Sequence, residues 1–415
     1  MNWFDNDDTN ITPEGFYFSG ISAGLKDSQK KDLGLILSPA NSTCTGLFTQ
    51  STVRAACVDL CEQRISKSGN LIRAILINSG HANACTGDLG LRDSLKATRE
   101  VAQLLGLNDD QVLICSTGII GVPIPISKLI SNLPLLVNKL SNDNSKDIAE
   151  AILTTDLTIK RSLIETEIEG RRIKILGIAK GSGMIYPNMA TMLSFLACDV
   201  GIEKNIWDSM IKEAAQISFN AISVDGDMST NDSLIALNGG NKIDPKYLPI
   251  IKEGINIVCQ RLAKAIARDG EGANCLIEVK VDGAKNDFDA LKIARKITSS
   301  SLVKTAIHGC DPNWGRIISA AGSSGVDFNL SDVDLFIGKY RILNGGNLIQ
   351  FDKEEISHYI KSKMMGKYLV SDTVEIKINL NSGEGIGRSW GCDLSKRYVE
   401  ICLLYTSPSP RDCKT

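Results

Sequence analysis

The order of apolar and polar positions predicts alternating strands and helices in the first part of the chain. Residues Leu71–Asn78 form an apolar run that ends in Ser-Gly, which is typical of a buried strand entering a loop. Apolar residues recur at helical spacing over 91–105, and Gly106 stands where a C-cap glycine belongs. A short strand over Val112–Cys115 is expected to run directly into Ser116-Thr117-Gly118.

The second half of the chain adds a long helix and two alternating segments. Apolar residues mark an amphipathic helix over 251–266, closed by Asp269-Gly270. Leu276–Val281 and Val374–Leu380 alternate apolar and polar residues, which predicts half-buried antiparallel strands. Together with the first half, this mixture predicts an α+β fold of layered sheets and helices rather than one parallel Rossmann sheet.

Domain boundaries are harder to predict than the elements. The length of 415 residues exceeds what one hydrophobic core usually serves, which favours two domains. The polar stretches Leu140–Asp147 and Asn238–Pro245 are expected to be surface loops. Neither is long enough to separate freely moving domains, and no internal repeat is visible, so composition alone sets no boundary.

Composition and charge exclude several classes of function. The chain is 43% hydrophobic with a formal net charge of −2, and its acidic and basic residues are interleaved. Such a chain lacks the basic surface expected of a nucleic-acid or membrane-surface protein. The opening MNWFDNDDTN is acidic, so no signal peptide is expected, and no stretch approaches the ~20 apolar residues of a membrane span. We therefore expect a soluble protein.

The cysteines favour neither disulfides nor a metal site. There are 12 cysteines but no Cys-x-x-Cys pair, and the three histidines, His81, His308 and His358, lie far apart in sequence. Cys115 and Cys198 stand inside apolar runs, where a thiol usually acts as a small buried hydrophobic group in a reducing compartment. We expect a cytoplasmic or organelle-matrix location, and no metal or bound cofactor.

The most unusual stretch of the chain is Lys180–Asp199, with the sequence KGSGMIYPNMATMLSFLACD. Taken alone, Thr191 at the start of an apolar run is simply a residue that favours strands. Its neighbours suggest more, because small Ala190 would let the Thr191 hydroxyl reach the preceding carbonyl, and the Gly, Pro and Asn residues before it can hold a strained backbone. These are the local needs of an N-to-O acyl shift that breaks the Ala190–Thr191 bond.

Such a cleavage would give Thr191 a free α-amine beside its own hydroxyl. Free α-amines have pKa values of roughly 7.7–8.0, so the amine can accept the hydroxyl proton near neutral pH. This arrangement activates a weak nucleophile without a histidine. It is therefore a plausible chemistry for a chain with only three histidines.

The segment Lys180–Asp199 resembles the cleavage segment of the glutamate N-acetyltransferase (ornithine acetyltransferase) family. Eight further motifs of this chain, between Gly15 and Ile401, match motifs of that family and occur in the same order. Eight ordered matches are far more specific than a single one. They are GFYFSGISAGLK near the start, NSGHANACTG (78–87), CSTGIIG (115–121), ILTTD (152–156), SVDGDMSTND (223–232), ARDGEGA (267–273), KTAIHGCDPNWGRI (304–317) and SWGCDLSKRYVEI (389–401).

The resemblance implies a fold, a division of the chain and a reaction. The fold would be the layered helix and sheet sandwich of the ornithine acetyltransferase (ArgJ/DmpA-like) type. The precursor would cut itself into an alpha chain, 1–190, and a beta chain, 191–401, that stay associated as a heterodimer, and two heterodimers would form a heterotetramer. Thr191 would move acetyl from N2-acetyl-L-ornithine to L-glutamate by ping-pong chemistry, within arginine biosynthesis. Some members of the family also accept acetyl-CoA.

The resemblance also implies residue roles. Thr117 and Gly118 match the oxyanion-hole pair, whereas an ordinary strand-to-loop turn is the alternative for the isolated motif. Lys180 matches a lysine that binds substrate carboxylate, although lysine is by default a solvated surface residue. Glu271 matches a glutamate that suits an amino-acid ammonium group. Thr154 matches a binding threonine, and Thr155 beside it is hard to exclude.

Three other features carry no predicted chemistry. Asp225, Asp227 and Asp232 suggest a calcium loop, but an EF-hand needs glycine and glutamate where this chain has Thr230 and Ala236, so we expect a structured turn. Gly181-Ser182-Gly183 lacks the Lys-Ser/Thr pair of a phosphate loop. His81 replaces the asparagine usual in the family's loop and is assigned no catalytic role.

The end of the chain departs from the family. Its members end in a motif like YV-x-INADYRT, in which the asparagine and the last threonine bind substrate, whereas this chain has Cys402 and Ser407 at those positions. The segment 402–415 resembles read-through of a sequencing adaptor. With two Ser-Pro pairs and no apolar face, it is predicted to be a non-native, disordered tail.

Two other functions remain open from the sequence. A self-processing amidohydrolase or aminopeptidase would share the nucleophile and pass its acyl group to water. A catalytically silent relative would lack the nucleophile or the oxyanion pair, yet Thr191, Thr117, Gly118 and Lys180 are all present. Only the altered tail favours the silent relative.

Overall fold

The chain forms two compact units in the computed structural model, which describes residues 2–7, 9, 11–68, 71–186 and 192–405. Unit 1 comprises Met1–Gly181, Asn188–Asn220 and Asp227–Leu262. Unit 2 comprises Ser182–Pro187, Ala221–Gly226 and Ala263–Thr415. The two units do not coincide with the two chains expected from cleavage, because residues on both sides of position 190 contribute to each unit.

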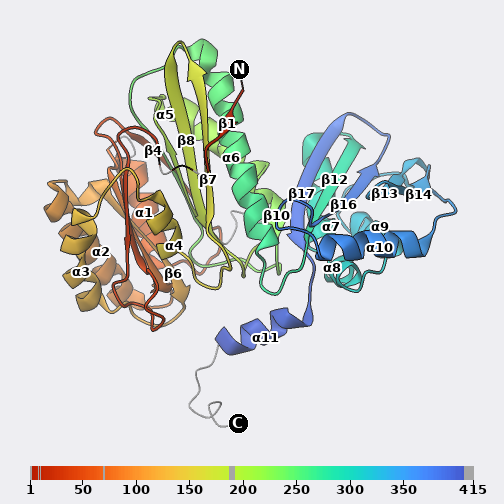
Figure 1. Cartoon of the computed structure of the whole chain (residues 1–415), viewed down its shortest axis with the longest axis horizontal. Helices are drawn as coiled ribbons and strands as arrows, with labels where there is room; N and C mark the ends of the chain where they lie inside the picture. Colours follow the sequence, from red (N-terminus) through yellow and green to blue (C-terminus); the bar gives the residue numbers. More distant parts are fainter. Residues whose placement is uncertain (1, 8, 10, 69–70, 187–191, 406–415) are drawn as a thin grey trace, which may run out of the picture. The chain divides into compact units, whose positions relative to one another are not determined.

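Unit 1 contains two sheets (Figure 1). The six-stranded sheet has the order β1 (Phe4–Asp5), β7 (Lys160–Ile168), β8 (Arg171–Lys180), β9 (Leu193–Cys198), β11 (Ser233–Asn238) and β4 (Thr43–Phe48). The four-stranded sheet has the order β2 (Tyr17–Ile21), β3 (Leu33–Leu37), β5 (Ala74–His81) and β6 (Val112–Ile119). In the six-stranded sheet, β9 and β11 run parallel and are connected through a helix.

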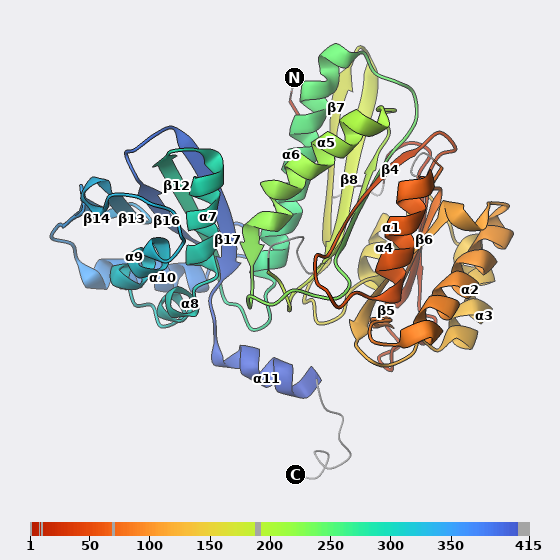
Figure 2. The ribbon, with the colours of Figure 1, turned by 180° about the vertical axis from the view of Figure 1, so that it is seen from behind.

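Helices cover both sheets of unit 1. They are α1 (Ala56–Ser68), α2 (Gly87–Leu105), α3 (Ile126–Asn138), α4 (Ser145–Ala151), α5 (Lys204–Gln216) and α6 (Leu248–Arg268), with short 3-10 turns at Asp109–Gln111, Phe219–Ala221 and Pro245–Tyr247. α1 and α2 pack on β6, and α4 packs on β2 and β3. α5, shown in Figure 2, is tied to β11 by the Trp207 Nε1–H, which donates to the Ala236 carbonyl over 3.1 Å.

Unit 2 is built on one seven-stranded sheet. Its order is β10 (Ile222–Ser223), β17 (Gly385–Cys392), β12 (Leu276–Ala284), β16 (Thr373–Asn379), β13 (Asp334–Ile337), β14 (Tyr340–Asn344) and β15 (Asn347–Leu348). The helices are α7 (Asp287–Thr298), α8 (Ser301–His308), α9 (Trp314–Gly322), α10 (Lys353–Met364) and α11 (Lys396–Tyr405), with a 3-10 turn at Leu330–Asp332. α7 packs on β12 and β17, and α10 packs on β16.

Each unit has its own apolar core. In unit 1 the core joins the four-stranded sheet to its helices, and fully buried side chains include Leu33, Leu76 and Leu113. In unit 2 the apolar face of β12 packs against α7, with Ile277, Val279 and Ile293 fully buried. Each of these two apolar clusters lies within one unit.

The strongest periodic signals in the sequence are confirmed. The helix expected over 91–105 is α2, and its C-cap Gly106 has a φ of 65° in the left-handed region that favours glycine. The helix expected over 251–266 is α6. The alternation over 276–281 and 374–380 corresponds to β12 and β16, whose buried and exposed residues alternate. The α+β layered fold is confirmed as well.

Several predicted boundaries are wrong, and the predicted antiparallel direction of two strands holds for only one neighbour of each. β12 and β16 pair parallel with each other and antiparallel only with their other neighbours, because alternation reports half-burial and not strand direction. Ser145–Asp147 lies in α4, and Asn238 is a buried strand residue of β11, so the two predicted surface loops are shorter than expected. α11 continues to Tyr405, past the predicted start of disorder at 402, since the prolines that end a helix come later.

Candidate functional site

The predicted nucleophile cannot be described from the structure. Ala190 and Thr191 lie outside the described residues, as does Ser407. The other predicted site residues are described and fall into two groups, one in each unit. Thr117, Gly118, Thr154 and Lys180 belong to unit 1, and Glu271 and Cys402 belong to unit 2.

The oxyanion pair predicted at Thr117 and Gly118 lies within a strand, not in a loop. β6 continues through Ile119 and pairs parallel with β5, with an irregularity in the register at His81. Gly118 has a φ of 133°, and a Cβ added there would lie 2.2 Å from the carbonyl carbon of Gly80. Only glycine fits this close approach, so the irregular strand explains the glycine structurally.

Lys180 is a buried residue at the end of β8 and not a solvated surface lysine. The whole residue is 8% exposed. Its Nζ lies 4.0 Å from the Asp156 carboxylate and donates to Thr117 Oγ1 over 3.4 Å. A lysine that donates to the Thr117 oxygen leaves the Thr117 hydroxyl proton available for another acceptor. The structure therefore brings Lys180 and Thr117 together, as a shared site requires.

Asp156, the last residue of the ILTTD motif, ties this group together. Its carboxylate is fully buried, lies 2.7 Å from the equally buried Lys160 Nζ, and accepts the Gly181 backbone N–H over 2.7 Å. Burial alone would raise the pKa of Asp156, but Lys160, Lys180 and the Gly181 N–H together hold that pKa well below its usual range. Asp156 is therefore a fixed negative charge that positions the end of β8.

Thr154 is positioned by the same carboxylate. Its backbone N–H donates to Asp156 Oδ2 over 3.1 Å, and its hydroxyl lies 3.5 Å from the same oxygen. Thr154 and Lys180 thus share one buried anion as a neighbour. Thr155, the neighbouring candidate, also makes contacts in the folded chain.

A small hollow of about 10 Å³ lies beside these residues in unit 1. Its walls are Thr117, Lys180, Met192, Leu193, Ser229, Asn231 and Asp232. A hollow of this size holds about one water molecule. Met192 is the residue that follows Thr191 in the chain. The hollow therefore joins two predicted site residues to the start of β9, directly after the predicted cleavage point.

Sequence reasoning missed three residues at this site. Asn231 is buried, and its Nδ2 donates to the carbonyls of Ala82 and Ser116, which fixes the backbone just before Thr117. Asp232 is 2% exposed and lines the hollow. Both belong to the motif SVDGDMSTND, which we interpreted only as a structured turn. The contacts of Asn231 with Ala82 and Ser116 join residues more than 100 positions apart, so no spacing rule reports them.

Lys26, from the first motif of the chain, is the third. Its Nζ donates to the Leu153 carbonyl over 2.7 Å, next to Thr154. The pKa of Lys26 is lowered to about 8, mainly by burial; the negative charge of Asp32 opposes this effect and the positive charge of Lys180 adds to it. Lys26, with its lowered pKa, thus lies close enough to Lys180 for the two charges to interact.

In unit 2, Glu271 lies on a tight loop after α6. Its backbone N–H donates to the Ser182 carbonyl over 2.9 Å. A Cβ added at Gly183 would lie 2.7 Å from the Glu271 carboxyl carbon, so only a glycine lets the carboxylate approach this backbone. Gly183, from the Gly-Ser-Gly segment that does not match a phosphate loop, thus borders the Glu271 carboxylate.

Cys402 reaches Glu271 from α11. Its Sγ lies 3.7 Å from Glu271 Oε2, within the range of a weak hydrogen bond from a thiol. Burial and then the Glu271 charge raise the pKa of Cys402, against a hydrogen bond with Tyr398 that lowers it. The position that matches the family's asparagine therefore contacts the predicted binding glutamate, but it offers only a thiol.

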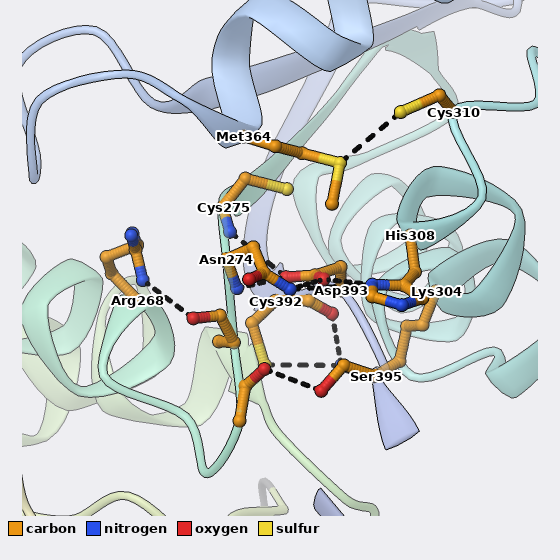
Figure 3. A network of polar contacts seen from close by, with 12 residues as sticks. Arg268, Asn274, Cys275, Lys304, His308, Cys310, Met364, Cys392, Asp393 and Ser395 are labelled. Carbon is orange, nitrogen blue, oxygen red and sulfur yellow. Dashed lines mark hydrogen bonds and ion pairs between the residues drawn. The ribbon is translucent and has the colours of Figure 1, made fainter. Parts of the chain in front are cut away.

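A network of polar contacts connects the loop that carries Glu271 to the segment just before α11 (Figure 3). Asp393 accepts the backbone N–H groups of Asn274 and Cys275 over 2.7 and 3.0 Å. Its other oxygen lies 2.9 Å from His308 Nδ1. Ser395 donates to the Gly272 carbonyl over 2.7 Å. These bonds tie the chain before α11 to the loop that carries Glu271.

Asp225, His81 and the cysteines are features to which we assigned no chemistry. Asp225 accepts the backbone N–H groups of Met184 and Ile185, which lie 41 and 40 residues earlier in the chain, so it binds a distant segment as well as standing in its own loop. Burial lowers the pKa of His81, which lies at the end of β5. No group of three or more His, Cys, Asp or Glu residues in the described part of the chain could hold a metal ion. Cys115 and Cys198 are buried, as predicted.

Among the described residues, no helix is both long enough and apolar enough to cross a membrane.

Comparison with known proteins points to one family. The family model described as "ArgJ family" matches residues 17–407. The chain is 64% identical over 395 residues to the arginine biosynthesis bifunctional protein ArgJ of Prochlorococcus marinus subsp. pastoris, covering 95% of this chain and 98% of that protein. It is 47% identical over 408 residues to the protein of the same name from Synechocystis sp., covering 96% and 98% of the two chains.

Solved structures give matches under the same names. The crystal structure of the arginine biosynthesis bifunctional protein from Bacillus halodurans is 40% identical, with a TM-score of 0.48, and covers 52% of this chain and 100% of that one. The ornithine acetyltransferase of Mycobacterium tuberculosis, solved as a complex with ornithine, is 30% identical with a TM-score of 0.42. It covers 45% of this chain and 99% of the solved chain.

Proposed function

Because the chain belongs to the ArgJ family, we propose that it is a self-cleaving acyltransferase of arginine biosynthesis that moves acetyl from N2-acetyl-L-ornithine to L-glutamate. The observation that carries this proposal is the hollow lined by Thr117, Lys180 and Met192. It combines a hydroxyl donor, a buried cation and the residue next to the predicted nucleophile. An acyl transfer that starts at Thr191 needs these parts in one place.

The proposed chemistry has two half-reactions. The Thr191 hydroxyl attacks the acetyl carbonyl of N-acetylornithine while the free Thr191 amine takes the hydroxyl proton. The C–N bond breaks, ornithine leaves with that proton on its amine, and an acetyl ester remains on Thr191. The glutamate amine then attacks the ester carbonyl, and the Thr191 oxygen regains a proton. N-Acetylglutamate leaves, and the enzyme is restored.

The oxyanion of each tetrahedral intermediate would be stabilised by the Thr117 hydroxyl and the Gly118 backbone N–H. Lys180 donates to the Thr117 oxygen, which orients the Thr117 proton away from the lysine and polarises the hydroxyl. Lys180 also offers its charge to a substrate carboxylate, and Glu271 suits an ammonium group. The reaction needs no metal or bound cofactor, and acetyl-CoA is a further acetyl donor to be tested.

The same proposal covers assembly and compartment. The alpha chain, 1–190, and the beta chain, from Thr191, would stay together as a heterodimer, with two heterodimers in a heterotetramer. The cytoplasmic location that we propose is supported by the cysteines, since all eleven in the described part of the chain are free thiols.

The first test is the intact mass of the recombinant protein beside a Thr191→Ala variant. We expect two fragments divided between Ala190 and Thr191 in the parent and one uncut chain in the variant. One uncut chain in both proteins would exclude the free-amine nucleophile and leave the silent relative.

Acetyl transfer then separates the transferase from a hydrolase. We expect ornithine release from N-acetylornithine to depend on glutamate and to yield N-acetylglutamate in equal amount. Release of acetate and ornithine at the same rate without glutamate would instead identify an amidohydrolase. A Cys402→Asn variant, run in parallel, tests whether the thiol beside Glu271 weakens substrate binding, because an amide offers both a donor and an acceptor.

A further inference from the structure

A second hollow lies in unit 1 at the far end of β9. It has a volume of about 350 Å³, much larger than the hollow beside Thr117. Residues from three loops and the start of α5 line it: Asn41, Thr43, Gly201, Ile202, Glu203, Lys204, Asn205, Asn238, Gly240 and Lys242. None of these residues has a role in the proposed acyl transfer.

The position of this hollow follows from the topology. β9 and β11 are parallel and are connected through α5, so the chain leaves both strands at the same edge of the sheet. The segments after the two strands lie side by side there, since Gly201 bridges Lys242 and its N–H donates to the Asn241 carbonyl. Ligands of α/β units bind outside the carboxyl ends of parallel strands, where the next helix begins.

The first turn of α5 adds hydrogen-bond donors to this edge. The helix begins at Lys204 and has 13 residues, so its N-terminus carries the partial positive charge of the helix dipole. The first backbone N–H groups of a helix have no partner within the helix. Glu203 occupies the N-cap position, but its side chain makes no capping bond. The start of α5 therefore has donors available for an anion.

Asn238 gives an independent indication of a ligand. It is fully buried, it forms part of the wall of the hollow, and its Oδ1 accepts the Ile202 N–H over 2.8 Å. Its Nδ2 has no hydrogen-bond partner within the described part of the chain. A buried amide donor without an acceptor is costly, so an oxygen atom from a bound molecule is the natural partner.

Two lysines of the wall supply hydrogen-bond donors for an anion. Their charges are balanced by two carboxylates, Glu203 in the wall and Asp208 behind it, so the donors and not a net charge would bind the anion. Lys242 pairs with Glu203 over 2.9 Å at the surface, and Lys204 pairs with Asp208 over 2.5 Å. An ammonium group has three donors, so both lysines keep donors for a further acceptor.

We propose that this hollow is a second, non-catalytic site that binds a small anion through a carboxylate or a phosphate group. The donors at the start of α5, the Asn238 amide and the Lys242 ammonium would bind the anion together. β9 separates this site from the catalytic hollow, because Leu193 borders the latter and six strand residues span roughly 20 Å. The proposal does not rest on the acetyl-transfer function.

Calorimetric titration of the full-length protein tests the site with two probes, inorganic phosphate and succinate. We expect at least one probe to bind, with roughly tenfold weaker binding in Lys242→Gln and no binding in Asn238→Asp, which keeps the acceptor for Ile202 but replaces the donor with a negative charge. Lys246→Gln is the matched control, since Lys246 is an exposed lysine that pairs with Glu169 and does not line the hollow.

A Lys180→Gln variant separates this site from the catalytic hollow. Binding that persists in Lys180→Gln and Lys246→Gln but falls in Lys242→Gln supports the second site. Binding of only one probe also supports it and identifies the ligand as a phosphate or a carboxylate. The proposal is overturned if neither probe binds the parent protein, if Lys242→Gln binds as tightly as Lys246→Gln, or if Lys180→Gln abolishes binding.

Discussion

Each unit of the molecule has a buried aspartate that organises its part of the site, and the two are neutralised in different ways. Asp156 in unit 1 lies between two lysines, Lys160 at 2.7 Å and Lys180 at 4.0 Å. Asp393 in unit 2 accepts three hydrogen bonds from Asn274 and Cys275 and faces His308. One carboxylate is held by full charges, and the other mainly by neutral donors.

The kind of partner, charged for Asp156 and neutral for Asp393, indicates what each carboxylate is suited to do. The Asp393 carboxylate accepts its hydrogen bonds from neutral N–H groups. Its main effect is therefore to fix the backbone at Asn274 and Cys275, just after Glu271. Asp156 instead holds cations, one of which also contacts Thr117. A buried charge pair is weak as a source of stability but costly to break. Here it also holds Lys180, the lysine that we propose binds a substrate carboxylate, in a fixed position. Asp156 therefore links stability to the proposed chemistry.

The largest expected effect is on stability, from Asp156→Asn. The substitution leaves Lys160 and Lys180 without their carboxylate in a buried place, which costs about 3–5 kcal/mol of unfolding free energy. Urea unfolding in the uncut Thr191→Ala chain measures this, because the chain then unfolds as one molecule. Adding Lys160→Met should restore part of the loss. An Asp156→Asn chain as stable as its parent would contradict the charge-pair interpretation.

Lys180→Met should act on substrate binding more than on stability. Asp156 keeps Lys160 as its partner in this variant, while the charge offered to a substrate carboxylate is lost. A hydrogen bond to a charged group contributes about 1.5–3 kcal/mol, so we expect KM to rise roughly 10- to 150-fold. Steady-state kinetics with N-acetylornithine would measure the change. A kcat that falls while KM stays constant would mean that Lys180 acts through the Thr117 hydroxyl alone and does not bind the substrate carboxylate.

Asp393→Asn should destabilise the chain less than Asp156→Asn does. Asparagine keeps one acceptor for the two backbone N–H groups but places an amide nitrogen against Asn274 and His308. We expect a loss of about 1–3 kcal/mol in the same urea measurement, because the groups left unsatisfied include no buried lysine. A loss equal to that of Asp156→Asn would mean that both carboxylates contribute to stability in the same way.

The smallest expected effect is a pH dependence that comes from Lys26. Burial lowers the pKa of Lys26 to about 8 from 10.5, so the folded chain binds fewer protons there than the unfolded chain between these two values. The contribution of Lys26 to stability should therefore increase as pH rises from 8 toward 10.5, and Lys26→Met should lack that increase. Thermal unfolding at pH 7.5 and 9.5 would compare the two chains, and identical pH responses would count against the lowered pKa.

The elements that were predictable from the sequence share one property, which is that their signal is local. The helical spacing before Gly106 and the alternation of β12 and β16 each report which face of an element is buried. The same signal cannot report which strands become neighbours, so the parallel pairing of β12 with β16 was not predictable. The motifs likewise indicated Thr117, Gly118, Lys180 and Glu271, but not what contacts them.

The site residues also divide into features that the sequence indicated and contacts that only folding created. Lys180 was singled out by its motif, yet its burial and its contact with Thr117 depend on the pairing of β8 within the six-stranded sheet and on the course of β6. Asp156 was present in a quoted motif and was passed over, because a carboxylate becomes a buried partner of two lysines only after folding. Asn231 was passed over for the same reason.

The sequence by itself determined the family, the main helices and strands, and the identity of the groups proposed to react. These properties depend on residue type and on spacing along the chain, which folding does not change. Tertiary structure decided the rest. It placed the buried charges around Asp156 and the neighbours of Glu271, brought Gly80 so close to position 118 that only glycine fits there, and formed the second hollow at the end of β9. Each of these depends on distances between residues far apart in sequence, which only the packing of strands and helices defines.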